Sequence, residues 1–150
     1  MKNENKVTFT YLKSLNKEIK SNDLTRQQKA FNILKALETK DIGLLIYNKY
    51  LQGKVHYLNY KRDNSLESLE KAVHCYHSIF ILGRQHRINV KSPKYFFKYA
   101  ETLHLLSKRV FCLFEQNRLH NKAYKIAIHS SIRYPNNSSL LWLKRHILES

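Results

Sequence analysis

The sequence predicts an all-α protein of about seven helices. Only three glycines and two prolines occur in 150 residues, too few for the tight turns of a strand-rich fold. Apolar residues make up 43% of the chain, which is enough to build a hydrophobic core at this length. Long stretches rich in Leu, Lys, Ala and Glu favour helices joined by short loops. We therefore expect antiparallel helical hairpins or an irregular helical bundle.

The first three helices are predicted from apolar residues at helical spacing, over about 6–20, 24–37 and 42–58. Asn22 or Asp23 can cap the second helix, and Asp41 can cap the third. Gly53 lies inside the third helix, where a glycine weakens the helix, and it indicates a close contact or a kink.

The fourth helix has a sharper start signal. Asn64 followed three residues later by Glu67 has the arrangement of a capping box, and an apolar stripe follows it. We expect this helix to end at Gly83. A polar connector over 84–91 then leads to the next helix.

The last three helices are also bounded by local signals. Ser92-Pro93 places a capping residue before a proline in the first turn, so a fifth helix is expected from Lys94 to about Gln116. A sixth is expected from Arg118 to Arg133, before Pro135. Asn137 or Ser138 can cap a short seventh helix.

No low-complexity tract or linker interrupts the chain, so one helical domain is expected over 1–150. Residues 41–150 would form its helical-hairpin core, and the helices of 1–40 would be docked least tightly. No stretch approaches the roughly 20 apolar residues of a membrane span, and the N-terminus has no apolar signal core. We expect a soluble, cytoplasmic protein without a membrane partner, and Cys75 and Cys112 as free, buried thiols.

Charge is the strongest functional signal. Lys and Arg number 27 against 11 Asp and Glu, for a net charge of +16. The excess is uneven, because residues 71–150 contain 14 basic and 3 acidic residues. Self-repulsion on this scale destabilises a compact domain unless a partner supplies negative charge. Nucleic acid is the partner that this charge favours.

The sixth predicted helix presents a basic ridge. At about 100° per residue its cationic side chains fall within roughly 80° of arc and extend over about 20 Å. No carboxylate stands four residues from any of them to neutralise it. Such a ridge matches a line of phosphates. Its members are Arg118, Lys122, Lys125, His129 and Arg133.

A second basic patch is predicted around the connector. It includes the start of the fifth helix, where free N–H groups favour anions. Tyr95 and Phe96 lie beside it and could stack on an unpaired base, although they could equally be core residues. The Lys61-Arg62 and Lys144-Arg145 pairs could extend this surface. The patch consists of Arg84, Arg87, Lys91, Lys94 and Lys98.

Metal-dependent and catalytic sites find little support. Glu70, His74 and His77 fall on one helical face beside Cys75, but no second group of ligands completes a zinc site. The three aspartates stand at predicted caps or turns, and no phosphate loop or Gly-x-Ser-x-Gly motif is present. We expect no catalytic residue, no cofactor and no metal, and therefore a protein that is not an enzyme.

Part of the second half resembles a tetratricopeptide-type repeat. Small residues and a closing proline match the spacing of its second helix, at Ala123, Ala127, Ser130 and Pro135. Val110 and Phe114 fall at its first-helix positions. A fainter match lies 51 residues upstream, instead of the usual 34, at Ala72, Tyr76 and Ile79. The resemblance implies stacked hairpins that bind a protein or peptide in a groove; ordinary antiparallel helix pairs also need small residues where they cross.

Two functions follow from these observations. The first is a non-enzymatic basic protein that contacts the phosphate backbone of RNA or DNA, alone or within a larger nucleoprotein assembly. The second is a tetratricopeptide-like adaptor or regulator, for instance one encoded by a phage or mobile element, that grips an acidic protein. The frequent Lys, Asn, Ile and Tyr agree with an AT-rich genome.

Overall fold

The computed structural model describes residues 7–150, and within that range every regular element is an α-helix. The all-α prediction is confirmed, including the number of helices for the described residues. The helices are α1 (Phe9–Lys20), α2 (Leu24–Ala36), α3 (Ile42–Asp63), α4 (Leu66–Gln85), α5 (Pro93–Ser107), α6 (Leu113–Arg133) and α7 (Ser138–Leu148). The predicted start of the first helix at Lys6 lies outside the described residues.

Side-chain caps set the beginning of several helices. The carboxylates of Asp23 and Asp41 accept hydrogen bonds from backbone N–H groups three residues on, both at 3.1 Å. Asn137 does the same for α7, at 3.0 Å from the N–H of Leu140. Each such cap contributes about 1 kcal/mol to helix stability, because it satisfies a donor that has no partner within the helix. α5 begins at Pro93, one residue before the predicted start, and Ser92 is its N-cap residue but makes no side-chain capping bond.

The predicted capping box at the start of α4 is wrong. Ser65, not Asn64, is the N-cap, and its hydroxyl accepts from the N–H of Ser68. Asn64 instead ends α3 in the left-handed conformation, with φ at 53°, which asparagine tolerates better than most residues. Glu67 forms an exposed ion pair with Lys71 at 2.9 Å.

The end of α4 also differs from the prediction. The helix continues through Gly83 to Gln85, and the connector folds back against it. A Cβ atom at Gly83 would lie 2.9 Å from the Val90 side chain and 3.0 Å from the Ile88 carbonyl oxygen. Gly83 is therefore required for close approach of the connector and does not end the helix.

The boundary between the fifth and sixth helices is misplaced in the prediction. α5 ends at Ser107, about nine residues before the predicted end, and α6 begins at Leu113. Gln116 fixes the connection by donating from its side chain to the carbonyl oxygen of Val110 at 2.5 Å. Val110 thus lies in a loop and Phe114 in α6, so neither occupies the first-helix position that the repeat resemblance gave it.

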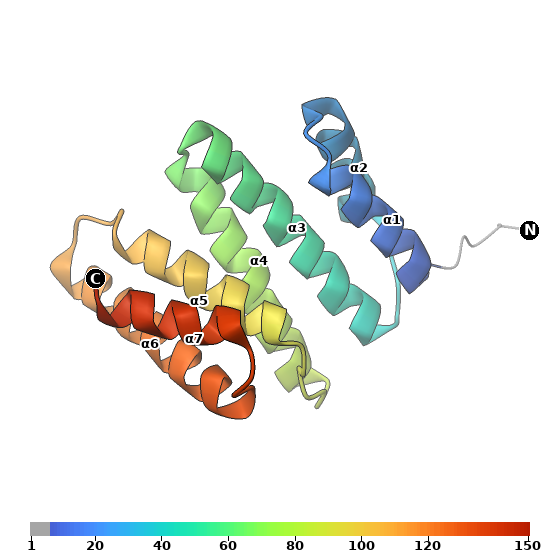
Figure 1. Ribbon diagram of the computed structural model, residues 1–150. Helices are drawn as coiled ribbons and strands as arrows, with labels where there is room; N and C mark the ends of the chain where they lie inside the picture. Colours follow the sequence, from blue (N-terminus) through green and yellow to red (C-terminus); the bar gives the residue numbers. More distant parts are fainter. Residues whose placement is uncertain (1–6) are drawn as a thin grey trace, which may run out of the picture.

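Consecutive helices form hairpins that lie side by side (Figure 1). α1 and α2 are at one end of the row, α3 and α4 in the middle, and α5 and α6 at the other end, where α7 packs on both. The core runs through all of them. A Cβ atom at Gly53 would meet the buried ring of Tyr76 at 2.5 Å, so the close contact predicted at this glycine is present between α3 and α4.

Candidate functional site

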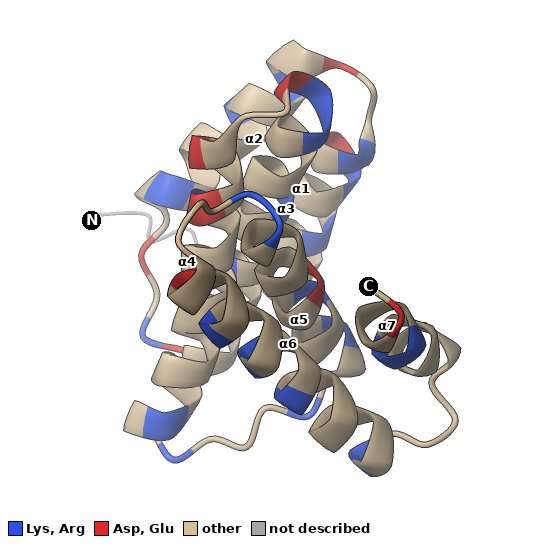
Figure 2. Cartoon of the chain, turned by 90° about the vertical axis from the view of Figure 1, so that its left-hand side faces the viewer, with Lys and Arg blue, Asp and Glu red and all other residues tan. Residues whose placement is uncertain are grey.

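The basic ridge lies along the outer side of α6. Lys125, His129 and Arg133 are exposed and Lys122 is half-buried. Ala123 and other small residues of the same helix are buried where α6 packs on α5 and α7. In Figure 2, Lys and Arg positions recur along α6, while an acidic position appears only near its start. The helical spacing therefore places the ridge on the solvent side.

Arg118 at the N-terminal end of the ridge is not free. Its guanidinium donates two hydrogen bonds to the carboxylate of Glu115, at 3.0 and 2.5 Å. The expectation of an unpaired ridge considered only carboxylates four residues away. Glu115 stands three residues before Arg118, which also places it on the same helical face. The pair is exposed and adds little stability, but it neutralises the positive charge of Arg118 locally.

At the other end of α6, Arg133 joins the ridge to the connector. Its guanidinium donates to the carbonyl oxygen of Val90 and to the side-chain oxygen of Asn89, both at 3.1 Å. The hydroxyl of Tyr134 donates to the carbonyl oxygen of Lys91. These contacts hold segments more than forty residues apart beside one another.

The cations of α4 and α6 also face a common region. The pKa of His77 is lowered by burial, then by the charges of Lys122, His74 and Arg84. The ring of His77 lies 2.7 Å from the hydroxyl of Tyr99, and Lys122 lies over the Tyr99 ring at 5.6 Å. We name the combined surface the outer basic surface. It comprises Arg84, Arg87, Lys91, Lys122, Lys125, His129 and Arg133.

Lys94 and Lys98, predicted in the same patch as the connector, face α3 instead. Lys94 lies 5.1 Å from the ring centres of both Tyr47 and Tyr50. Lys98 lies 4.1 Å from the ring centre of Tyr57 and pairs with Glu101 at 3.2 Å. The predicted second patch is therefore divided between two sides of α5.

These two lysines belong to a group of lysines from three helices that the sequence pattern did not predict. Lys54 of α3 is half-buried, and its ammonium lies 2.7 Å from the side-chain oxygen of Asn16 on α1. Burial, and then the charges of Lys20, Lys98 and Lys94, lower the pKa of Lys54 to about 8. We name this group the inner lysine cluster; its members are Lys13, Lys20, Lys54, Lys94 and Lys98.

A local signal for the inner lysine cluster was present. Tyr47, Tyr50, Lys54 and Tyr57 are spaced three, four and three residues apart, so they share one face of α3. Burial lowers the pKa of Lys94 as well, with further contributions from Lys13 and Lys20. Charge that is partly desolvated and surrounded by like charge favours an anionic ligand.

The aromatic residues proposed for base stacking are packed within the protein. Tyr95 stands edge-on to Tyr50 with ring centres 5.0 Å apart. Phe96 lies 5.0 Å from Phe80 and beneath the guanidinium of Arg133, at 5.7 Å. Both are half-buried, which leaves little ring surface for a base.

The thiols differ from each other. Cys75 is buried and burial raises its pKa to about 11, so the thiol is protonated at neutral pH. Cys112 is exposed, contrary to the prediction, because it caps α6 and does not lie within a helix. Among residues 7–150 no group of His, Cys, Asp and Glu is arranged to hold a metal ion.

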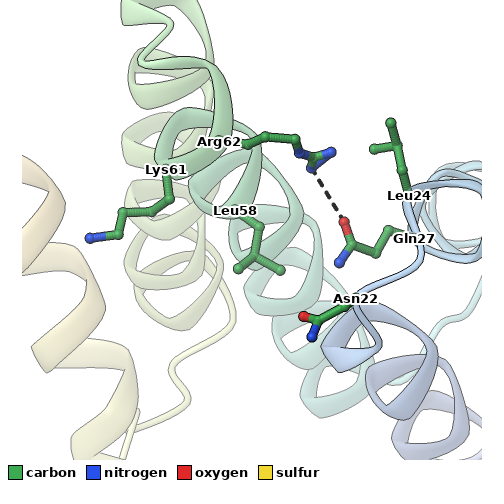
Figure 3. A pocket seen from close by; sticks show the side chains of 6 residues that line it. All are labelled: Asn22, Leu24, Gln27, Leu58, Lys61 and Arg62. Carbon is green, nitrogen blue, oxygen red and sulfur yellow. Dashed lines mark hydrogen bonds between the residues drawn. The ribbon is translucent and has the colours of Figure 1, made fainter.

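Lys61 and Arg62 lie apart from the outer basic surface. They line a pocket of about 370 Å³ between α2 and α3, on the side of α3 that faces away from α6 (Figures 1 and 3). Arg62 donates to the side-chain oxygen of Gln27 at 3.3 Å and of Asn59 at 2.9 Å. Lys61 lies over the Tyr57 ring at 5.9 Å, the ring that Lys98 also contacts, so it stands beside the Lys98 part of the predicted patch and not beside the outer basic surface.

No protein family model, no curated protein and no solved structure matches this chain. Of the helices formed by residues 7–150, none combines the length and the apolar character needed to span a bilayer.

Proposed function

We propose that this chain is a non-enzymatic helical-hairpin protein that binds the phosphate backbone of RNA or DNA through the outer basic surface. One observation carries the proposal. Cations from two distant segments, 84–91 and 122–133, meet on one face, and none of them pairs with a carboxylate of residues 7–150. Exposed surfaces usually mix charges of both signs, so an unneutralised surface of this extent favours an anionic ligand.

Phosphates would bind here by displacing counterions. Each phosphate contact steepens the plot of log affinity against log salt concentration by about 0.7–0.9. With four contacts, affinity should fall on the order of 10²-fold between 50 and 200 mM salt. Backbone contacts of this kind position a strand but do not read its sequence, so we expect weak sequence preference.

The inner lysine cluster favours a second candidate function, an adaptor for an acidic protein. Its lysines and tyrosines come from α1, α3 and α5, which brings together the first helices of successive hairpins. The part of the tetratricopeptide resemblance that lies within α6, the buried small residues Ala123, Ala127 and Ser130, favours the same role. We rank it second because Lys54 is held by Asn16 and Lys98 by Glu101, which leaves fewer free cations than on the outer basic surface.

The two functions are separated by a nuclease-treated affinity purification, in which a nucleic-acid ligand is lost and a protein partner is retained. The direct test compares two double variants. The first carries Lys122→Glu and Lys125→Glu, and the control carries Lys29→Glu and Lys40→Glu. The control residues are both exposed and make the same change in net charge, but they lie on and after α2, at the far end of the row. The proposal requires the first pair to weaken nucleic-acid binding strongly and the control pair to retain most of it.

A further inference from the structure

Three large apolar side chains are exposed at the start of α6. Phe111 is 100% exposed, Phe114 76% and Leu113 69%. We name these three residues the aromatic tip. Single exposed apolar residues are ordinary, but three within four positions on a protein this basic are a candidate contact surface.

The aromatic tip is held in place by its surroundings. Arg109, just before it, donates to the side-chain oxygen of Asn64 at 2.7 Å and from its N–H to the carbonyl oxygen of Leu106 at 2.9 Å. Gln116, just after it, donates to the carbonyl oxygen of Val110. Because both sides of the tip are bonded to the fold, the backbone that carries the rings is held in place, which reduces the backbone entropy lost on binding.

The tip is in line with the cations of α6. Phe114 precedes Arg118 by four residues and Lys122 by eight. At about 100° per residue, its side chain leaves the helix within roughly 40° of Arg118 and roughly 20° of Lys125. A ligand lying along this face of α6 would therefore meet an aromatic group at one end, then the neutralised pair of Glu115 and Arg118, and then the positive charges of Lys122 and Lys125.

We propose that the nucleic acid bound along α6 is single-stranded, and that an unpaired base stacks on the aromatic tip while the following phosphates contact Lys122 and Lys125. This inference rests on the proposed function. A ring beside a line of cations matches a chain that carries both bases and phosphates. In a duplex the bases already stack on one another, so only an unpaired strand can offer a free base face.

The test measures binding of a fluorescent 12-nucleotide single strand and of the duplex of the same sequence. Stacking contributes roughly 5- to 150-fold in affinity per base, so the double variant Phe111→Ala, Phe114→Ala should bind the single strand at least 5-fold more weakly and the duplex unchanged. Phe114→Trp should retain single-strand affinity, because the larger ring also stacks. The substituted side chains are exposed, so the melting temperature should not fall.

Three outcomes overturn the inference. These are unchanged single-strand affinity in the double alanine variant, an equal loss on single strand and duplex, or self-association of the free protein that the same substitutions abolish. The pair Lys122→Glu, Lys125→Glu separates this failure from failure of the proposed function. If charge reversal weakens binding of both nucleic acids while the alanine variant does not, only the stacking inference is wrong. If the unmodified chain binds neither nucleic acid, both proposals are wrong.

Discussion

Arg133 of α6 donates a hydrogen bond to the main-chain oxygen of Val90, 43 positions earlier in the chain. This contact, with the one to Asn89, determines that the connector cations stand beside those of α6. The outer basic surface is thus a product of tertiary structure as well as of helical spacing.

Replacing Arg133 should therefore weaken nucleic-acid binding even when the positive charge is kept. Arg133→Lys keeps the charge but cannot donate to both oxygens in the fixed geometry of a guanidinium. We expect about 3- to 10-fold weaker nucleic-acid binding, together with faster hydrogen exchange at amides 87–91. Arg118→Lys is the matched control, since it makes the same substitution at an arginine that pairs with Glu115 of its own helix and holds no distant segment. Equal effects of the two substitutions would contradict this role for Arg133.

Removing the carboxylate of Glu115 should strengthen binding. Glu115→Gln releases Arg118 for a phosphate, and one additional contact should steepen the salt dependence by about 0.7–0.9. Glu67→Gln, which removes a more exposed carboxylate from its pair with Lys71 on α4, is the control. Titrations of both variants at several salt concentrations test the expectation. A slope that stays unchanged in Glu115→Gln, or rises equally in the control, would show that Arg118 makes no phosphate contact.

Stability should fall on mild acidification because of His104. This side chain is 2% exposed, neither ring nitrogen has a hydrogen-bond partner within residues 7–150, and burial followed by the charges of Lys108, His146 and His120 lowers its pKa to about 4. An unfolded histidine has a pKa near 6.5, so below that pH the unfolded chain binds a proton that the folded chain does not. The free energy of unfolding should decrease as the pH falls.

The expected loss from His104 is about 2 kcal/mol between pH 7 and pH 5. Burial also lowers the pKa of His56 to about 4, so the unmodified chain should lose more than this in total. His104→Leu should remove the part of this decrease in the free energy of unfolding that His104 causes. Urea unfolding of both proteins at pH 7 and pH 5 measures the difference. An identical pH dependence in His104→Leu and the unmodified chain would contradict the assignment.

Replacing Lys54 should stabilise the fold at neutral pH. Its folded-state pKa of about 8 lies below the ordinary value near 10.5, so its charge opposes folding at every pH below about 8, and that cost disappears as the pH rises toward 10.5. Lys54→Met keeps the length of the side chain. We expect a gain of about 1–2 kcal/mol at pH 7, after allowing for partial solvation and the lost bond to Asn16, and a smaller gain at pH 10.

Urea unfolding of Lys54→Met and the unmodified chain at the two pH values checks this prediction. Lys49→Met, on the same helix but outside the inner lysine cluster, controls for the loss of one positive charge. A variant at Lys54 that is less stable at pH 7, or whose gain is the same at pH 10, would mean that the cluster does not strain the fold.

Features set by neighbours in sequence could be predicted. Asp23, Asp41 and Asn137 cap helices because a short oxygen-bearing side chain before an apolar repeat satisfies free N–H groups regardless of the tertiary structure. The ridge on α6 follows from helical spacing in the same way. The α5–α6 junction could not be found, because residues 108–112 contain no Gly or Pro and continue the apolar pattern.

Features that depend on how hairpins meet were not predictable. Lys94 and Lys98 are separated from the connector cations because one particular face of α5 packs toward α3. The inner lysine cluster needs α1, α3 and α5 at a particular stagger, which only packing determines. Asn64 is suited both to end α3 in the left-handed conformation and to cap α4. It ends α3, and the neighbouring Ser65 caps α4.

The most direct test of the nucleic-acid proposal is the salt dependence of binding by the unmodified chain and by the Lys122→Glu, Lys125→Glu pair. For the unmodified chain we expect a log–log slope of about −3 or steeper on single-stranded RNA or DNA. The paired variant should have a slope at least 1.4 units shallower, because two phosphate contacts are lost. An affinity that hardly changes with salt, or a slope that is the same in both proteins, would contradict the outer basic surface as a phosphate-binding site.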